Sequence, residues 1–142
     1  MNYQHTTPKE RALFVDGYTE ALLWSTPAYR EGDEGDSQTP YDSCIPVAPE
    51  LLAAIETFAL EFLDSNERAL DLAARDGRGW DYLGQDAHLT REGHGSGFWD
   101  RGDIRKPLRD ILTDAAFADR SDVYLWVAQD EDGDDIIRGD VQ

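Results

Sequence analysis

Apolar side chains recur every three or four residues from about Pro49 to Arg75, which is the longest periodic pattern in the chain. Steps of this size place side chains along one face of an α-helix. The apolar stripe consists of Leu51, Leu52, Ile55, Phe58, Ala59, Phe62, Leu63, Ala69, Leu72 and Ala73. The acidic residues that fall mostly on the opposite side are Glu50, Glu56, Glu61, Asp64, Glu67 and Asp71. We therefore predict one long helix, and we expect its two phenylalanines to pack against Leu125 or Trp126 of a later strand.

Two further helices are predicted, one before and one after this stripe. Thr7 can cap a helix and Glu10 can close a capping box with it, and this helix should end before Pro27. A later helix can be capped by Asp103 and run to about Ala118. The run Asp76–Gly79, directly after the long helix, contains two glycines and is typical of a helix terminator.

The strands are predicted from β-branched and aromatic runs. Residues 123–128 form a convincing strand, and Asp132-Gly133 suits a hairpin turn before Ile136-Ile137. A second hairpin is predicted from residues 88–90 to residues 98–99, across a glycine-rich connection. The resulting fold class is α+β, with three helices packed on a small antiparallel sheet that is built from two hairpins.

The chain has 142 residues, which suits a single domain spanning residues 1–142. Residues 28–46 contain several glycines, prolines and acids, and we predict a long acidic loop there. Loops of this length inside a compact domain tend to be functional. Cys44 is the only cysteine, so no disulfide can form within the chain, and neither a signal peptide nor a membrane span is recognised. These features favour a cytoplasmic protein.

The formal net charge of −17 is the strongest global property of the chain. Such a field disfavours nucleic acid and anionic membranes as partners, and it favours basic protein surfaces, above all those that bind a phosphate backbone. The plain alternative is that the acidity only keeps the protein soluble. If the acids form a contact surface, the candidates lie in the acidic loop and on the long helix: Glu31, Asp33, Glu34, Glu56, Glu61 and Asp64.

The segment from Asp86 to Asp103 is the densest in groups that can bind or catalyse. It can be interpreted as a hairpin whose aromatic residues fill the core, or as a site whose glycines direct several side chains to one region. In the hairpin, Arg91 would pair with Glu92 or Asp86. The candidate binding residues are Asp86, His88, Arg91, His94, Ser96, Trp99 and Asp100.

Signals for catalysis and metal binding in this segment are weak. His88 and His94 could supply nitrogen ligands, but they match neither HExxH nor HxH spacing, and we predict no metal. Ser96 lies in Gly-Ser-Gly and not in the Gly-x-Ser-x-Gly of a nucleophile elbow. We therefore assign no catalytic residue and no cofactor from the sequence.

The string Leu89–Asp100 resembles a motif in a family of small uncharacterised tailed-bacteriophage proteins, Leu-Thr-Arg-x-Gly-His-Gly-x-Gly-Phe-Trp-Asp. Residues Gly84–Asp86 extend the resemblance, and Ala21–Ser25 match an upstream Ala-Leu-Leu-Trp-Ser segment. Gln85 stands where the family has His, and Glu92 where it has Asn. The family has no established activity to carry over, so the resemblance implies a phage origin and, with it, the cytoplasm of a bacterial host.

Together these features predict a phage-encoded acidic protein that inhibits a host defence complex or a complex handling DNA or RNA. It would be an inhibitor of the anti-CRISPR or anti-restriction type that acts by nucleic-acid mimicry, with a basic nucleic-acid-binding protein as its partner. Direct binding of nucleic acid or of a membrane is not expected. The alternative is a small-molecule enzyme or ligand-binding protein that uses the loop Gly93–Gly97. The sequence does not distinguish a monomer from a homodimer.

Overall fold

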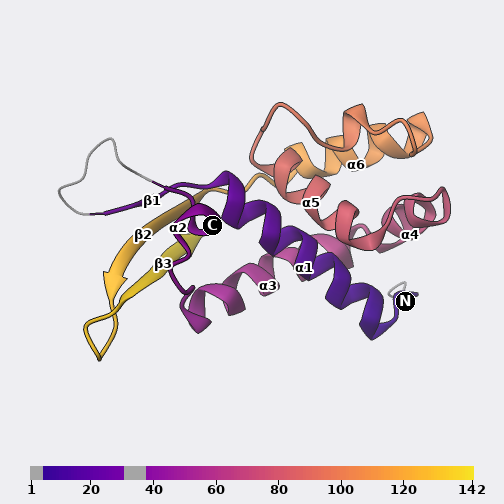
Figure 1. The fold of residues 1–142 in the computed structure, drawn as a ribbon. Coiled ribbons are helices and arrows are strands. Elements are labelled where there is room, and N and C mark those ends of the chain that lie inside the picture. Colours follow the sequence, from indigo (N-terminus) through magenta and orange to yellow (C-terminus); the bar gives the residue numbers. More distant parts are fainter. Residues whose placement is uncertain (1–4, 31–37) are drawn as a thin grey trace.

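The computed structural model describes residues 5–30 and 38–142, and its fold is α+β (Figure 1). Its elements in chain order are α1 (Pro8–Ser25), β1 (Ala28–Tyr29), α2 (Pro40–Ser43), α3 (Pro49–Ser65), α4 (Glu67–Arg75), α5 (Trp80–Arg91), the 3₁₀-helix η1 (Phe98–Asp100), α6 (Lys106–Ala118), β2 (Val123–Gln129) and β3 (Asp135–Val141). The predicted α+β class is confirmed. Within these described residues, however, six α-helices and one three-stranded sheet replace the predicted three helices and two hairpins.

Helix α1 begins with the predicted capping box. The Thr7 hydroxyl oxygen accepts the backbone N–H of Glu10 at 3.1 Å, and the Glu10 carboxylate accepts the backbone N–H of Thr7 at 2.8 Å. The other carboxylate oxygen of Glu10 accepts the indole N–H of Trp80 at 2.9 Å, which ties the start of α1 to the start of α5. The helix ends at Ser25, two residues before Pro27, as predicted.

Helices α1 and α5 approach each other so closely that their backbones touch. A Cβ atom at Gly17 would lie 1.8 Å from the carbonyl oxygen of Asp81, and one at Gly84 would lie 2.0 Å from the carbonyl oxygen of Phe14. Only glycine leaves room for such an approach. These two glycines therefore position α5, which carries several of the candidate site residues.

The predicted long helix is divided into α3 and α4 at Asn66. Its side-chain amide and its backbone N–H both donate to the Phe62 carbonyl, at 2.9 and 3.1 Å, and its φ of −130° is not helical. This break rotates the inward face, so that Glu67 and Asp71 are buried rather than on the predicted solvent side. The buried carboxylate of Glu67 lies 3.5 Å from the guanidinium of Arg11, which compensates its charge.

The predicted C-terminal hairpin is formed by β2 and β3. They pair in antiparallel fashion, from Val123 opposite Val141 to Gln129 opposite Asp135, and Gly133 adopts a positive φ of 81° in the turn. Strand β1 pairs with β2 in parallel, so the strand order is β1-β2-β3 and the sheet is mixed. The other predicted hairpin, from residues 88–90 to residues 98–99, is wrong, because these residues lie in α5 and η1.

The sheet lies at one end of the helical part of the molecule, beside the start of α3 (Figure 1). Leu51 packs there, since a Cβ atom at Gly139 would lie 3.3 Å from its side chain. Phe62 is eleven residues further along α3, about 16 Å away at 1.5 Å per residue. It is fully buried but stacks on Phe98, with ring centroids 6.3 Å apart, and not on the predicted β2 residues.

Two predicted boundaries also change. Helix α6 begins at Lys106 with Pro107 in its first turn, and not at Asp103, whose carboxylate instead pairs with Arg78 at 3.4 Å. The predicted loop at 28–46 contains β1 and the short helix α2, while residues 31–37 lie outside the described part of the chain.

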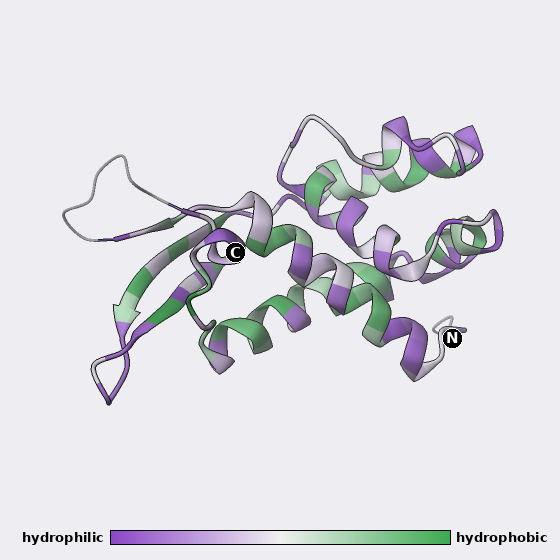
Figure 2. Ribbon diagram, viewed as in Figure 1, coloured by the Kyte–Doolittle hydropathy of each residue, from purple (hydrophilic) through white to green (hydrophobic). Residues whose placement is uncertain are grey.

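Apolar residues are concentrated along α3 and on β2, as Figure 2 shows. The buried ones form one cluster to which α1, α3, α5, α6, β2 and β3 all contribute. Of the helices in the described ranges, none is both long and apolar enough to cross a bilayer.

Candidate functional site

The segment from Asp86 to Asp103 is a helix end followed by a turn. Gly93 adopts a φ of 75° and donates its N–H to the Thr90 carbonyl at 3.1 Å, while the His94 N–H donates to the Leu89 carbonyl at 2.9 Å. These two bonds are the pair that defines a Schellman motif at a helix C-terminus. The glycine therefore ends α5 and reverses the chain, so that His94 returns toward the last turns of the helix.

This reversal brings together three side chains, His88, Glu92 and His94, which we call the histidine–glutamate cluster. The Nε2 atoms of the two histidines lie 3.4 Å (His88) and 3.5 Å (His94) from the same Glu92 carboxylate oxygen, Oε2. The two imidazole centroids are 6.1 Å apart. His88 is fully buried and Glu92 is mostly buried, whereas 35 % of the His94 side chain is exposed. The cluster is thus a set of three close donor groups that is exposed to solvent at His94.

The surroundings of His88 hold its ring in place. Its edge packs against the ring of Tyr18 with centroids 5.2 Å apart, and its Nε2 lies 3.3 Å from the Ser25 hydroxyl. Burial disfavours the charged imidazolium and lowers the pKa of His88, although the Glu92 carboxylate opposes this shift. Burial therefore favours the neutral ring, which is the form in which imidazole binds metals.

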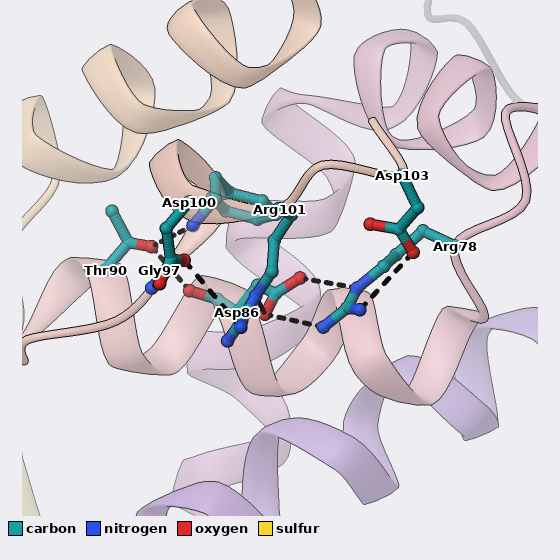
Figure 3. A network of polar contacts seen from close by, with 8 residues as sticks. Arg78, Asp86, Thr90, Gly97, Asp100, Arg101 and Asp103 are labelled. Atoms are coloured by element: carbon teal, nitrogen blue, oxygen red, sulfur yellow. Dashed lines mark hydrogen bonds and ion pairs between the residues drawn. The ribbon is translucent and has the colours of Figure 1, made fainter. Parts of the chain in front are cut away.

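Asp86 is part of a separate network, which Figure 3 shows. Its fully buried carboxylate accepts from Nε of Arg101 at 2.7 Å and from Nε and Nη2 of Arg78 at 3.0 and 3.2 Å. Arg78 also reaches Asp103 at 3.4 Å. Burial raises the pKa of Asp86, against the opposing effect of both guanidinium groups. Because its oxygens are already occupied, Asp86 is placed to hold the α5–η1 turn together.

Thr90 joins the same turn to α5 (Figure 3). Its hydroxyl donates to the Asp86 carbonyl at 2.7 Å and accepts the Phe98 N–H at 3.1 Å. Gly97 passes so close to it that a Cβ atom there would lie 2.3 Å from the hydroxyl oxygen. The Asp100 carboxylate accepts the Gly97 N–H at 3.1 Å. Asp100 therefore stabilises η1.

Arg91 is one of the largest fully buried side chains of the described chain, with 2 % of its side chain exposed. It pairs with Asp119 at 3.2 Å, and the predicted pairing with Glu92 or Asp86 is wrong. Its remaining donors bond to the Tyr18 hydroxyl, the Phe58 carbonyl and the Asp119 carbonyl. These contacts link α1, α3, α5 and the end of α6, so the structure places Arg91 in the core.

Two candidates of this segment lie nearer the surface. Trp99 is exposed over 47 % of its area, and Ser96 is half-buried in the turn before it. The arrangement thus separates the seven predicted residues. His88 and His94 meet in the histidine–glutamate cluster, Asp86 and Asp100 support the turn, and Arg91 is in the core.

The acidic candidates separate as well. Glu56 and Glu61 are exposed on α3, and neither forms an ion pair with a residue that the structure describes. Asp64 is exposed but pairs with Arg11 at 2.8 Å. The remaining three, Glu31, Asp33 and Glu34, lie outside the described residues.

A groove between α1 and α3 adds two carboxylates that sequence reasoning did not select. Two adjoining hollows of about 450 and 460 Å³ share Val15, Asp16 and Glu56, and Glu20 lines one of them. We call this surface the acidic groove, lined by Val15, Asp16, Glu20, Leu23, Leu52 and Glu56. Asp16 and Glu20 are four residues apart on α1, which puts both on one helix face. This i, i+4 spacing is the sequence feature from which the acidic face of α1 could have been predicted.

Glu92 is the other residue that sequence reasoning missed as a site residue. Its signal was the spacing His88–Glu92 at i and i+4, which is informative only once residues 80–91 are recognised as a helix.

No protein-family model, curated protein or solved structure matches this chain.

Proposed function

We propose that this protein binds a basic segment of a nucleic-acid-handling protein in the acidic groove, and thereby competes with that protein's nucleic acid. The observation that carries the proposal is the groove itself. Its rim presents the exposed carboxylates of Asp16, Glu20 and Glu56, and these form no ion pair within the described residues. Unpaired carboxylates on a rim are available to a partner's lysines and arginines.

The apolar residues of the groove, which we call its floor, favour an amphipathic helix as the occupant. Val15, Leu23 and Leu52 line the same hollow as the three carboxylates. An amphipathic helix with a basic face could place its apolar side chains on this floor while its cations reach the rim. Burial of apolar area would supply short-range affinity, and the net charge of −17 would raise the association rate. A basic amphipathic segment of a nucleic-acid-binding protein has this chemistry.

The biological setting belongs to the same proposal. The resemblance at Leu89–Asp100 supports a bacteriophage protein acting in the cytoplasm of its host, and an acidic antagonist there would act on defence or DNA-handling machinery, as anti-restriction and anti-CRISPR inhibitors do. The alternative, a small-molecule enzyme that uses the loop Gly93–Gly97, would have no need of the groove carboxylates.

Capture experiments with matched charge variants test the proposal. The full chain and the variant Glu20→Lys/Glu56→Lys would be immobilised and exposed to bacterial lysate. The control Glu131→Lys/Asp132→Lys changes two exposed acids in the β2–β3 turn. Each double change adds four charges, from −17 to −13, so both variants have the same net charge.

We expect the wild type and the turn variant to retain a nucleic-acid-binding protein that the groove variant loses, and we expect duplex DNA or RNA to displace it. Equal retention by all three proteins would contradict the groove as the site. Equal loss from both variants would show that only net charge matters, which also contradicts the proposal. Circular dichroism of each variant verifies that the fold is intact.

A further inference from the structure

We propose that the histidine–glutamate cluster is a binding site for one divalent transition-metal ion of the zinc type, held by Nε2 of His88, Oε2 of Glu92 and Nε2 of His94. In the described part of the chain, these are the three residues whose ligand atoms lie within 4.8 Å of one another. Two imidazoles and one carboxylate form a ligand set found in zinc enzymes.

The spacing of the Glu92 oxygen from each histidine nitrogen matches tetrahedral coordination. Zinc binds imidazole nitrogen and carboxylate oxygen at about 2.0–2.1 Å, and the edge of a tetrahedron with such bonds is about 3.3–3.4 Å. The two observed distances from Glu92 Oε2 to the histidine nitrogens are 3.4 and 3.5 Å. The third spacing is within 4.8 Å, and the partly exposed His94 ring can move to close the set on an ion.

The backbone preforms this geometry. Glu92 is the C-cap residue that follows α5, and its backbone still has helical angles. It lies one helical turn beyond His88, so the two side chains lie on the same face. The Schellman motif at Gly93 then fixes the position of His94 through its own N–H bond to Leu89. Little conformational entropy would be lost when the ligands close on an ion, because the backbone already holds all three.

The cluster would provide three protein ligands and leave a fourth position open. His94 is one-third exposed and Glu92 is 14 % exposed, so an ion can enter and keep a water molecule on that side. Structural zinc sites are usually closed by four protein ligands, whereas three ligands and a water are typical of catalytic ones. Ser25, whose hydroxyl lies 3.3 Å from His88 Nε2, borders the site.

Nitrogen ligands determine which ions should bind. Zn²⁺, Co²⁺ and Ni²⁺ prefer imidazole, whereas Mg²⁺ and Ca²⁺ prefer sites made of oxygen alone. This preference separates the cluster from the many carboxylates elsewhere on the surface. Nδ1 of His88 is buried and has no hydrogen-bond partner among the described residues, so the usual second-shell support is missing on that ring. Such support is worth about 10–100-fold in affinity, and the site should bind correspondingly more weakly than a zinc enzyme's.

The test uses chelator-treated full-length protein without a histidine tag, titrated with Zn²⁺ by calorimetry and with Co²⁺ by visible absorption. Co²⁺ reports geometry, because its absorption is strong in tetrahedral sites and weak when water and carboxylates surround it octahedrally. The variants are His94→Ala and Glu92→Gln, whose side chains are partly exposed and can be changed without opening the core. The control is His5→Ala, which removes a histidine remote from the cluster in sequence.

We expect one Zn²⁺ per chain, a tetrahedral Co²⁺ spectrum and a higher melting temperature with Zn²⁺. His94→Ala and Glu92→Gln should each weaken binding by at least about tenfold, because loss of even an outer-shell partner of a ligand costs about 10–100-fold, while His5→Ala leaves it unchanged. The proposal is overturned if the spectrum is octahedral, if Zn²⁺ binding is absent, or if His5→Ala weakens binding as much as the two cluster variants do.

Discussion

The guanidinium of Arg91 donates to the hydroxyl of Tyr18 at 3.0 Å inside the core, and it is stacked between aromatic rings of α1 and α3. Arg91 belongs to α5 and is almost completely buried. The carbonyl of Phe58 accepts a second bond from the same nitrogen at 3.1 Å. One cation thus satisfies polar groups from three helices, and the position of the candidate site depends on it.

Replacing this arginine should therefore be costly. Arg91→Met keeps a long apolar side chain but removes the donor on which Tyr18, Phe58 and Asp119 depend. Asp119 is 59 % exposed and stays solvated, but the buried Tyr18 hydroxyl and Phe58 carbonyl lose their donor, so we expect the free energy of unfolding to fall by about 1–3 kcal/mol or more. Arg68→Met, at an exposed position of α4, is the control. A loss below about 1 kcal/mol in urea denaturation would show that the buried guanidinium is not needed.

The crossing of α1 and α5 leads to a second prediction. In Gly84→Ala the new methyl group would lie 2.0 Å from the Phe14 carbonyl oxygen, so the two helices must separate. We expect a loss of about 1–3 kcal/mol or more in stability. Gly102→Ala meets nothing within 4 Å and serves as the control. Equal melting temperatures for both variants would contradict the close helix contact.

The stack of Phe62 on Phe98 leads to a third prediction, on core stability. Phe62→Ala should cost about 3–5 kcal/mol, because it opens a cavity between α3 and η1. The control is Leu52→Ala, at a position of the same helix that is 41 % exposed. If both changes shift the denaturation midpoint alike, Phe62 does not have the core position described.

The capping box predicts a pH dependence of stability. The Thr7 backbone N–H bonded to Glu10 holds the pKa of this carboxyl below its usual 4.5, and the Thr7 hydroxyl and Trp80 indole act in the same direction. A carboxyl whose pKa is lowered on folding stabilises the protein above its unfolded pKa. That contribution is lost as the pH falls through the folded pKa.

Glu10→Gln is the variant that tests this contribution, since its side chain resembles the protonated acid. At pH 7 it should be less stable than the wild type by about 0.3–1 kcal/mol, the usual value of a charge at a helix N-terminus. The difference should shrink as the pH falls below about 4.5 and protonates Glu10 in the folded protein. A difference in unfolding free energy that stays constant from pH 7 to pH 3 would refute the role of the charge.

The elements that could be predicted from the sequence are those specified by local chemistry. The capping box at Thr7 and Glu10 began α1 as expected, and the turn at Asp132-Gly133 joined β2 to β3 as expected. In each case a few adjacent residues determine the structure. Strand β1 has only two residues and pairs with β2 nearly a hundred residues later, so no local pattern could reveal it.

The candidate site shows why α5 was not predicted and a hairpin was predicted in its place. A glycine with positive φ can turn a hairpin or end a helix, and Gly93 ends α5. Because residues 80–91 also contain buried polar groups such as Asp86 and His88, their apolar periodicity is weak. The meeting of His88, Glu92 and His94 follows from that helix end. It could not be predicted from spacing while the segment was interpreted as strand.

The central claim is that the acidic groove binds a basic surface that otherwise holds nucleic acid, and its salt dependence is the most direct measurement. Affinity of the captured partner for the full chain would be measured between 50 and 150 mM salt, over which the Debye length falls to about 8 Å. We predict a steep decline in affinity with salt, displacement by duplex DNA or RNA, and a weaker salt dependence for Glu20→Lys/Glu56→Lys. An affinity that is flat in salt and unchanged in that variant would contradict the claim, and would point instead to a short-range contact such as the exposed Trp99.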